Sequence, residues 1–193
     1  MLGEELFYRA GGLVPVNPIF IEDLMLHKGA VRSSQLERTS GIAAHFMKEI
    51  DIKRNDVFII VSTSGRNPVP IEVAQIAKER GAFTIAITSP RYAIHQPSRH
   101  PDGLFLYEVV DLVIDNHAPI GDTLLHEEAF SLSFGPSSTA IGSTIINGIS
   151  AEAINIMIQN GTTPPIFKSG NVDGADEFNK QLIEKYKKRM PYL

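Results

Sequence analysis

Two apolar stretches in the first half of the chain have the pattern of buried strands with a helix between them. Residues 56–61 and 82–88 are almost wholly apolar and rich in β-branched side chains, which is typical of strands covered on both faces. Between them, residues 68–80 place apolar side chains at helical spacing, and Gly81 follows as a stop signal. Strand, helix and strand in this order predict a βαβ unit whose two strands are parallel.

The N-terminal part of the chain continues the alternation of helices and strands. We expect a helix over residues 1–10 and a short strand over the apolar run 16–21. Residues 33–50 have the periodicity of one amphipathic helix, which Ser33 or Ser34 is expected to cap.

The second half predicts a third strand over residues 112–115, a loop of mixed polarity over 116–136 and a long helix from about 138 to 160. The long helix is apolar on more than one side, so we expect it to be buried, partly against another subunit. Altogether the pattern predicts an α/β fold with a doubly wound, mostly parallel sheet flanked by helices. We expect one domain over residues 1–193, in which 171–193 form a polar C-terminal helix and tail.

The composition is that of an ordinary globular protein. The chain has 193 residues, 43% of them hydrophobic and 21% charged, which is enough for one sizeable core. Nucleic-acid binding normally needs a basic face, and a net charge of −4 gives no reason to expect one, so no nucleic-acid partner is expected. The absence of cysteine excludes disulfides, thiolate metal sites and a cysteine nucleophile.

The N-terminus indicates no export signal. Residues 1–12 include Glu4, Glu5 and Arg9 and lack the apolar core of a signal peptide. No run reaches the roughly 18 consecutive apolar residues of a membrane span. We therefore expect a soluble, cytoplasmic protein without a membrane partner.

The turn between the first buried strand and its helix, residues 62–68, carries three hydroxyl groups where parallel α/β sheets bind ligands. Asn67 is the expected N-cap, and Pro68 suits the first helical position. Free N–H groups and the partial positive charge of the helix start make this turn a candidate phosphate cradle. The candidate binding residues are Ser62, Thr63, Ser64, Gly65 and Asn67. An ordinary capped turn is the alternative.

The same turn lacks the sequence features of a nucleotide site. It contains neither the Gly-Lys-Ser/Thr of a Walker A loop nor the G-x-G-x-x-G of a dinucleotide fold. No cofactor is expected.

A second hydroxyl cluster, formed by Ser137, Ser138 and Thr139, precedes the long helix. Two such clusters at helix starts suggest a ligand held from two sides. Taken alone, the second cluster fits a helix cap as well as a ligand contact.

With these residues, the chain resembles the SIS (sugar isomerase) domain family over nearly its whole length. The residues that carry the resemblance are the apolar strand, the Ser-Thr-Ser-Gly turn, the helix and the second strand within 56–88. The chain looks closest to an uncharacterised, phosphoheptose isomerase-like branch. The resemblance implies a flavodoxin-type three-layer fold and a phosphorylated sugar as ligand. It also implies that Ser62, Ser64 and Asn67 hold the phosphate.

Two branches of the family imply catalytic residues. In phosphoheptose isomerases a helix carries Glu-Glu-Leu and then Arg, which here reads Glu4-Glu5-Leu6 and Arg9, so Glu5 matches the catalytic carboxylate. In N-acetylmuramic acid 6-phosphate etherases the two catalytic glutamates fall on Glu5 and Glu37. The alternatives are a solvated helix residue for Glu5 and a helix-cap acid for Glu37. The isomerase's catalytic histidine has no counterpart in the long helix.

The family pattern also starts earlier than this chain. It has a helix, an apolar strand and a Gly-x-Gly-x-Ser turn ahead of the Glu-Glu helix, within which this chain begins. We therefore expect Met1 to be an internal methionine and the first helix and strand of the family fold to be lacking.

Three functions remain open from the sequence. The first is a sugar-phosphate isomerase with Glu5 and Glu37 as bases. The alternatives are an etherase-like lyase acting on an amino-sugar phosphate, and a non-catalytic phosphosugar sensor that acts through a protein partner. Because resembling families build their sites at subunit contacts, a homo-oligomer, either a dimer or a tetramer, is expected.

The histidines add one more possibility. Asp122 and His126 have the i, i+4 spacing of a metal pair, provided that this loop is helical. His126 is alternatively an acid/base group. We expect no metal site.

Overall fold

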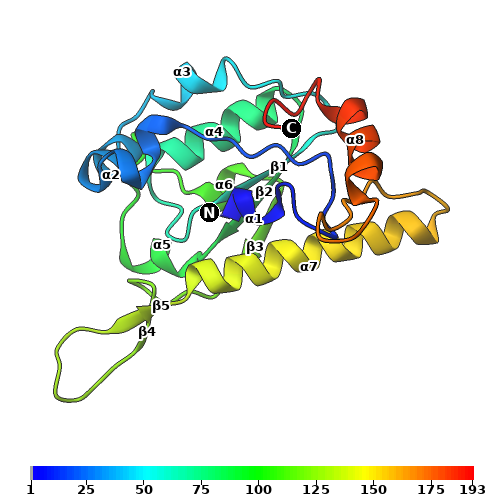
Figure 1. Ribbon diagram of the computed structural model, residues 1–193. Coiled ribbons are helices and arrows are strands. Elements are labelled where there is room, and N and C mark those ends of the chain that lie inside the picture. The colour runs from blue at the N-terminus through cyan, green and yellow to red at the C-terminus, as the bar shows by residue number, and fades with distance from the viewer. Residues whose placement is uncertain (1) are drawn as a thin grey trace. The chain divides into compact units, whose positions relative to one another are not determined.

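The computed structural model describes residues 2–193, which form two compact units (Figure 1). One unit is the continuous segment 20–139, and the other combines the residues up to 19 with 140–193. The expectation about Met1 falls on a residue outside the described range. A single domain over the whole chain stays a prediction.

A three-stranded parallel sheet is the centre of the unit of residues 20–139. The strands run in the order β1 (Val57–Val61), β2 (Phe83–Thr88) and β3 (Leu112–Asp115). In the register, Ile87 of the middle strand lies between Val61 and Ile114. The α/β class and the predicted parallel βαβ unit are confirmed.

Two helices pack together and against this sheet, α4 (Pro68–Glu79) against β1 and β2, and α6 (Leu106–Val109) against β2. Their shared core consists of Ile60, Ile71, Ala74, Ala86 and Leu106. Burying each large aliphatic side chain in such a core contributes about 1.5–3 kcal/mol. The carboxyl ends of β1 and β2 are therefore held on a rigid base.

The carboxylate of Asp111 ties the segment before β3 to β2 and α4. It accepts hydrogen bonds from the N–H (2.8 Å) and the hydroxyl (2.7 Å) of Thr84 and pairs with Lys78 Nζ at 2.8 Å. The hydrogen bond from Lys78, with those from Thr84, lowers the pKa of Asp111 from 3.8 to about 2. The folded state therefore favours the ionised carboxylate of Asp111 over its protonated form.

We predict that Asp111 contributes to acid stability in a defined pH window. Because its folded-state pKa is depressed, its contribution is complete above its ordinary pKa of 3.8 and is lost as the pH falls toward about 2. Asp111→Asn should remove this part of the pH dependence, measured by circular dichroism between pH 5 and 2. The exposed Asp173→Asn is the matched control. Identical acid-unfolding curves for Asp111→Asn and wild type would contradict the prediction.

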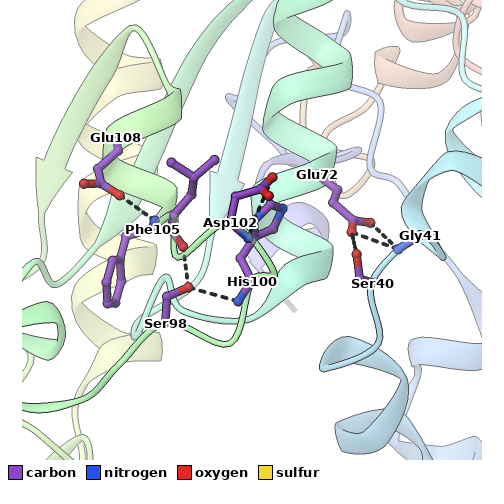
Figure 2. Close-up of polar contacts among 9 residues, drawn as sticks. Ser40, Gly41, Glu72, Ser98, His100, Asp102, Phe105 and Glu108 are labelled. Atoms are coloured by element: carbon purple, nitrogen blue, oxygen red, sulfur yellow. Dashed lines mark hydrogen bonds and ion pairs between the residues drawn. The ribbon is translucent and has the colours of Figure 1, made fainter.

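The predicted helix over residues 33–50 is two helices, α2 (Ala30–Glu37) and α3 (Ala43–Met47). Gly41, which lies between them, has a φ of +86° and breaks the helical path. Glu72 of α4 accepts hydrogen bonds from the Ser40 hydroxyl and from the Gly41 N–H (Figure 2). The prediction of one continuous helix is therefore wrong, because the backbone donor at the break bonds to a distant carboxylate.

The predicted cap of this helix is also wrong. The helix begins after Gly29, and Ser33 lies inside it. The Ser33 side chain is buried and its hydroxyl donates to the Leu24 carbonyl at 2.7 Å. Leu24 ends the first of two short 3₁₀ helices, which cover Glu22–Leu24 and Leu26–Lys28.

Beyond β2 the chain forms the short helix α5 (Arg91–His95) and, after β3, a hairpin. The hairpin pairs β4 (Thr123–Leu125) with β5 (Phe134–Pro136) in antiparallel fashion. The sequence predicted only a loop here, because three-residue strands are too short to leave a clear alternation.

The second unit contains α1 (Leu2–Leu6), most of α7 (Ser138–Gln159) and α8 (Ala175–Tyr186). The first helix is shorter than predicted, and Tyr8, which follows it, has a positive φ of +51°. The polar C-terminal helix lies where the sequence predicted it.

The predicted strand over residues 16–21 is not formed. Instead, Leu13 makes an isolated antiparallel bridge with Ile166. Pro15 and Pro18 lack backbone N–H groups, so the apolar run around them cannot extend a hydrogen-bonded ladder.

The long helix α7 is mostly exposed in the part of the chain that the structure describes. Only Gly142 and Ile146 are buried, whereas Ile141, Ile156 and Ile158 are exposed. Within residues 2–193 the chain itself therefore buries little of this helix, and its burial against another subunit stays a prediction.

By length and composition α7 is able to cross a membrane. It has 22 residues and a window of mean hydropathy 1.3, although no 18 consecutive residues are apolar. The sequence argument from consecutive apolar residues missed this. One such helix is weak evidence for a membrane span, because helices of soluble proteins meet the same criteria.

Candidate functional site

The hydroxyl-rich turn lies at the carboxyl end of β1 and is fixed to the end of β2. The Ser62 N–H donates to the Ile87 carbonyl at 3.2 Å. The Thr63 carbonyl accepts from the Ser89 N–H at 2.8 Å and from the Thr88 hydroxyl at 3.3 Å. The backbone of the turn is therefore positioned without using the side chains of the turn itself.

Those side chains are available to a ligand. The residues Ser62, Thr63 and Ser64 are half-buried, and none of their hydroxyl groups has a hydrogen-bond partner within residues 2–193. The N–H groups of Ser64 and Gly65 likewise donate to no acceptor in that range. Several donors at one turn, none of them used inside the protein, are what an oxyanion needs.

Gly65 is required by the protein's own packing. Its φ is +57°, and a Cβ atom at this position would lie 2.8 Å from Thr88 Oγ1 and 3.2 Å from Leu106 Cβ. Gly65 is among the candidate binding residues predicted from the sequence, but its contact with β2 and α6 already explains a glycine at this position.

Asn67 occupies the N-cap position of α4, as predicted, but its side chain makes no cap hydrogen bond. The residue is buried, and its Oδ1 accepts from Arg99 Nη1 at 2.9 Å. The Arg99 N–H also donates to the Arg66 carbonyl at 2.8 Å. Asn67 thus joins the turn to the loop that carries Arg99.

Positive charge collects beside the turn. Burial first, and then the charges of Arg66 and Arg38, lower the pKa of Arg99, whereas the negative charge of Glu37 raises it. Glu37, a predicted catalytic residue, is the last residue of α2 and lies within electrostatic reach of this arginine. The structure therefore brings Glu37 and the first hydroxyl turn to the same region.

The second hydroxyl turn is occupied by a carboxylate of the protein. Asp122 Oδ1 accepts from the Ser137 N–H (3.1 Å), the Ser137 hydroxyl (3.0 Å) and the Ser138 N–H (2.8 Å). Asp122 Oδ2 accepts from the Ser138 hydroxyl at 2.5 Å. The third member of the cluster, Thr139, is exposed. Asp122 thus takes the place at the start of α7 that an anionic ligand would take.

Electrostatics support this reading of Asp122. Burial alone would raise the pKa of its carboxyl group, but hydrogen bonds from Ser138 and Ser137 outweigh burial and lower it. The side chain is therefore held as an anion. Sequence analysis missed this role, because Asp122 lies 15 residues before the serines it contacts.

Glu5, the other predicted catalytic residue, lies on α1 in the second unit. Its carboxylate accepts from Asn147 Nδ2 at 3.2 Å and pairs with Arg9 at 3.3 Å. The side chain remains 29% exposed, so the carboxylate keeps access to solvent.

The suggested metal pair is not supported. Asp122 and His126 flank β4 rather than lying on a helix, so the i, i+4 spacing does not bring their side chains close together as one turn of a helix would. Across residues 2–193 no group of three or more His, Asp or Glu side chains is arranged to hold a metal ion. His126 is exposed.

Comparison with known proteins assigns the family. Residues 1–89 match the SIS domain. The chain is 61% identical over 193 residues to a UPF0309 protein of Geobacillus kaustophilus, with all of this chain and 77% of the relative covered. UPF0309 proteins of Halalkalibacterium halodurans and Thermoanaerobacter pseudethanolicus are 56% and 48% identical, with all of this chain and 77% and 79% of each relative covered. The chain belongs to the UPF0309 family.

This UPF0309 chain therefore carries an SIS domain, as the sequence resemblance implied. The matched residues include α1, the first hydroxyl turn and β2. They do not include the second turn at Ser137 and Ser138. An SIS domain indicates binding of a carbohydrate derivative, a phosphorylated sugar.

Proposed function

We propose that this UPF0309 protein binds a phosphorylated sugar through the turn of residues 62–67. The observation that carries the proposal is the set of unused hydroxyls of Ser62, Thr63 and Ser64 at the carboxyl end of a parallel strand. The free amides beside them and the nearby arginines favour an anion at this place.

The first turn is a better phosphate site than the second. At the second turn, a phosphate would have to displace Asp122, which already receives four hydrogen bonds from Ser137 and Ser138. At the first turn, it would displace only solvent. We therefore place the phosphate on Ser62, Thr63, Ser64 and Asn67. We no longer assign Ser137, Ser138 and Thr139 to the ligand, because Ser137 and Ser138 already bind Asp122.

For the chemistry, we propose sugar-phosphate isomerisation, in which a carboxylate moves a proton next to a carbonyl group. Glu5 or Glu37 takes the proton. An etherase-like lyase would start from the same proton abstraction. A sensor that acts through a protein partner would use the binding turn alone.

We also propose that the protein lies in the cytoplasm.

The binding proposal is tested by isothermal titration with hexose, heptose and amino-sugar phosphates, each beside its free sugar. We expect phosphosugars to bind and free sugars not to bind. Ser64→Ala should weaken binding about 10- to 150-fold, because a hydrogen bond to a charged group is worth about 1.5–3 kcal/mol. Ser131→Ala, at an exposed hairpin position, is the control. Equal affinities for phosphosugars and free sugars would exclude the proposal.

We also propose that the protein is a homo-oligomer. The support is α7, whose exposed isoleucines form apolar surface that a second subunit can cover. Multi-angle light scattering should give a dimer or tetramer mass, and Ile156→Glu should lower that mass. A monomer at micromolar concentration would count against it.

A further inference from the structure

Three arginines beside the phosphate turn have no acidic partner. Within residues 2–193, Arg38, Arg66 and Arg99 form no ion pair, although the positive charges of Arg66 and Arg38 both act on Arg99. Glu37 is the single carboxylate that acts on Arg99. The local charge is therefore positive even after Glu37 is counted.

Neutral side chains hold two of these arginines in place. Arg66 Nη1 donates to Gln96 Oε1 at 3.1 Å, and Arg99 Nη1 donates to Asn67 Oδ1 at 2.9 Å. The Nε atom of Arg66 is buried and has no acceptor among the described residues. Buried guanidinium donors normally find partners, and an unfilled one beside like charges is costly without an anion.

Hydrogen bonds on both sides of α4 fix the two segments that carry Arg38 and Arg99 (Figure 2). On one side, Glu72 holds Ser40 and Gly41, two and three residues after Arg38. On the other side, the Ser98 hydroxyl donates to the Leu104 carbonyl at 2.5 Å, and the His100 N–H donates to Ser98 Oγ at 3.0 Å. The side chains of Arg66 and Arg99, and the backbone beside Arg38, are thus held in place, which lowers the cost of binding a ligand.

The hydroxyl turn does not need these arginines to hold a phosphate. Three hydroxyls and two free amides already supply enough donors for the oxygens of one phosphate group. Guanidinium forks suit a carboxylate or a phosphate, which they bind with two parallel hydrogen bonds. The arginines are therefore available for a second anionic group.

We infer that the ligand is a sugar derivative with two anionic groups. Its phosphate lies on the Ser62–Gly65 turn, and its second group, a carboxylate or another phosphate, lies at Arg38, Arg66 and Arg99. This inference rests on the proposed phosphosugar function and names the class of sugar that the site selects.

The test compares one-anion with two-anion compounds at fixed ionic strength by isothermal titration. The probes are glucose 6-phosphate, glucose 1,6-bisphosphate and 6-phosphogluconate. We expect at least one two-anion compound to bind ten-fold or more tightly than glucose 6-phosphate. Which of the two does so identifies the second group as a phosphate or as a carboxylate.

Arg38→Gln is the decisive variant, because Arg38 is exposed and holds no loop in place. It should lower the ratio of two-anion to one-anion affinity about ten-fold. Arg54→Gln, which removes an exposed arginine just before β1, at the opposite end of that strand, should leave the ratio unchanged. Circular dichroism of both variants checks that they are folded.

The outcomes separate this inference from the function on which it rests. If glucose 6-phosphate binds and neither two-anion compound binds more tightly, the inference is overturned while phosphosugar binding stands. An equal loss of affinity for all three compounds in Arg38→Gln also overturns it, because the arginines would then serve the first phosphate. If no compound binds, both the inference and the proposed function fail.

Discussion

Replacing Glu5 by Gln is expected to reduce turnover of the phosphosugar about 10²–10⁴-fold, the usual contribution of a general base. Binding should be little affected, because the amide cannot take a proton but has nearly the same shape. The amide oxygen still accepts the hydrogen bond from Asn147 Nδ2, and the half-exposed pair with Arg9 is worth little. Loss of turnover with retained affinity would therefore identify a chemical role for Glu5 rather than a structural one.

The experiment follows the conversion of each phosphosugar that binds, by NMR of the sugar signals. Glu152→Gln is the matched control, because Glu152 also accepts from an asparagine side chain, Asn155 Nδ2 at 3.4 Å. Glu37→Gln tests the second candidate base in the same assay. Unchanged turnover in Glu5→Gln would remove this residue from the mechanism. A wild-type protein that binds phosphosugars and converts none would favour the sensor.

The βαβ unit was predictable because its signals are local. Residues 57–61 and 83–88 are apolar and rich in β-branched side chains, and Gly81, with a φ of +90°, follows the helix between them. The predicted cover on both faces is confirmed for β2, which is buried except at Phe83, and is wrong for β1, where only Ile60 is buried. The position of the hydroxyl-rich turn followed from the same signals. Strand, turn and helix are consecutive in the chain, so their order alone places the hydroxyls at the end of the sheet.

The errors occur where distant residues decide the structure. Apolar periodicity runs unbroken through residues 33–50, but Glu72, more than 30 residues away, takes the donors of Ser40 and Gly41 and stops the helix. The Ser-Gly pair was a signal that this helix breaks. Near residue 16, the partner of the bridge at Leu13 is Ile166, which no local pattern reveals.

The candidate site shows the same division. Ser62 and Ser64 were found from the turn itself, whereas Arg99 reaches Asn67 across 32 residues and had no sequence signal. Asp122 was considered as a metal ligand, but it binds the two serines that were expected to bind substrate. Hydroxyl groups at the start of a helix predict a hydrogen-bond acceptor beside them. The sequence alone does not show whether that acceptor belongs to a ligand or to the protein.

Gly65→Ala is expected to destabilise the unit of residues 20–139 by about 2–6 kcal/mol. A non-glycine residue at positive φ costs about 1–3 kcal/mol, and forcing an extra carbon into a packed site costs a similar amount. Both terms apply here, because the added Cβ would lie 2.8 Å from Thr88 Oγ1 and 3.2 Å from Leu106 Cβ. Urea unfolding followed by circular dichroism measures the loss.

Gly103→Ala separates the two terms. Gly103 has a φ of +71° and no atom within 4 Å of an added Cβ, so it pays the backbone cost without the steric one. The difference between the two variants should therefore be about 1–3 kcal/mol. Equal destabilisation would mean that β2 and α6 do not enclose Gly65 as described. The hydroxyls of Ser62 and Ser64 stay unused because other groups hold the turn in place: backbone hydrogen bonds to the end of β2, the Thr88 hydroxyl, and the hydrogen bond from Arg99 to Asn67.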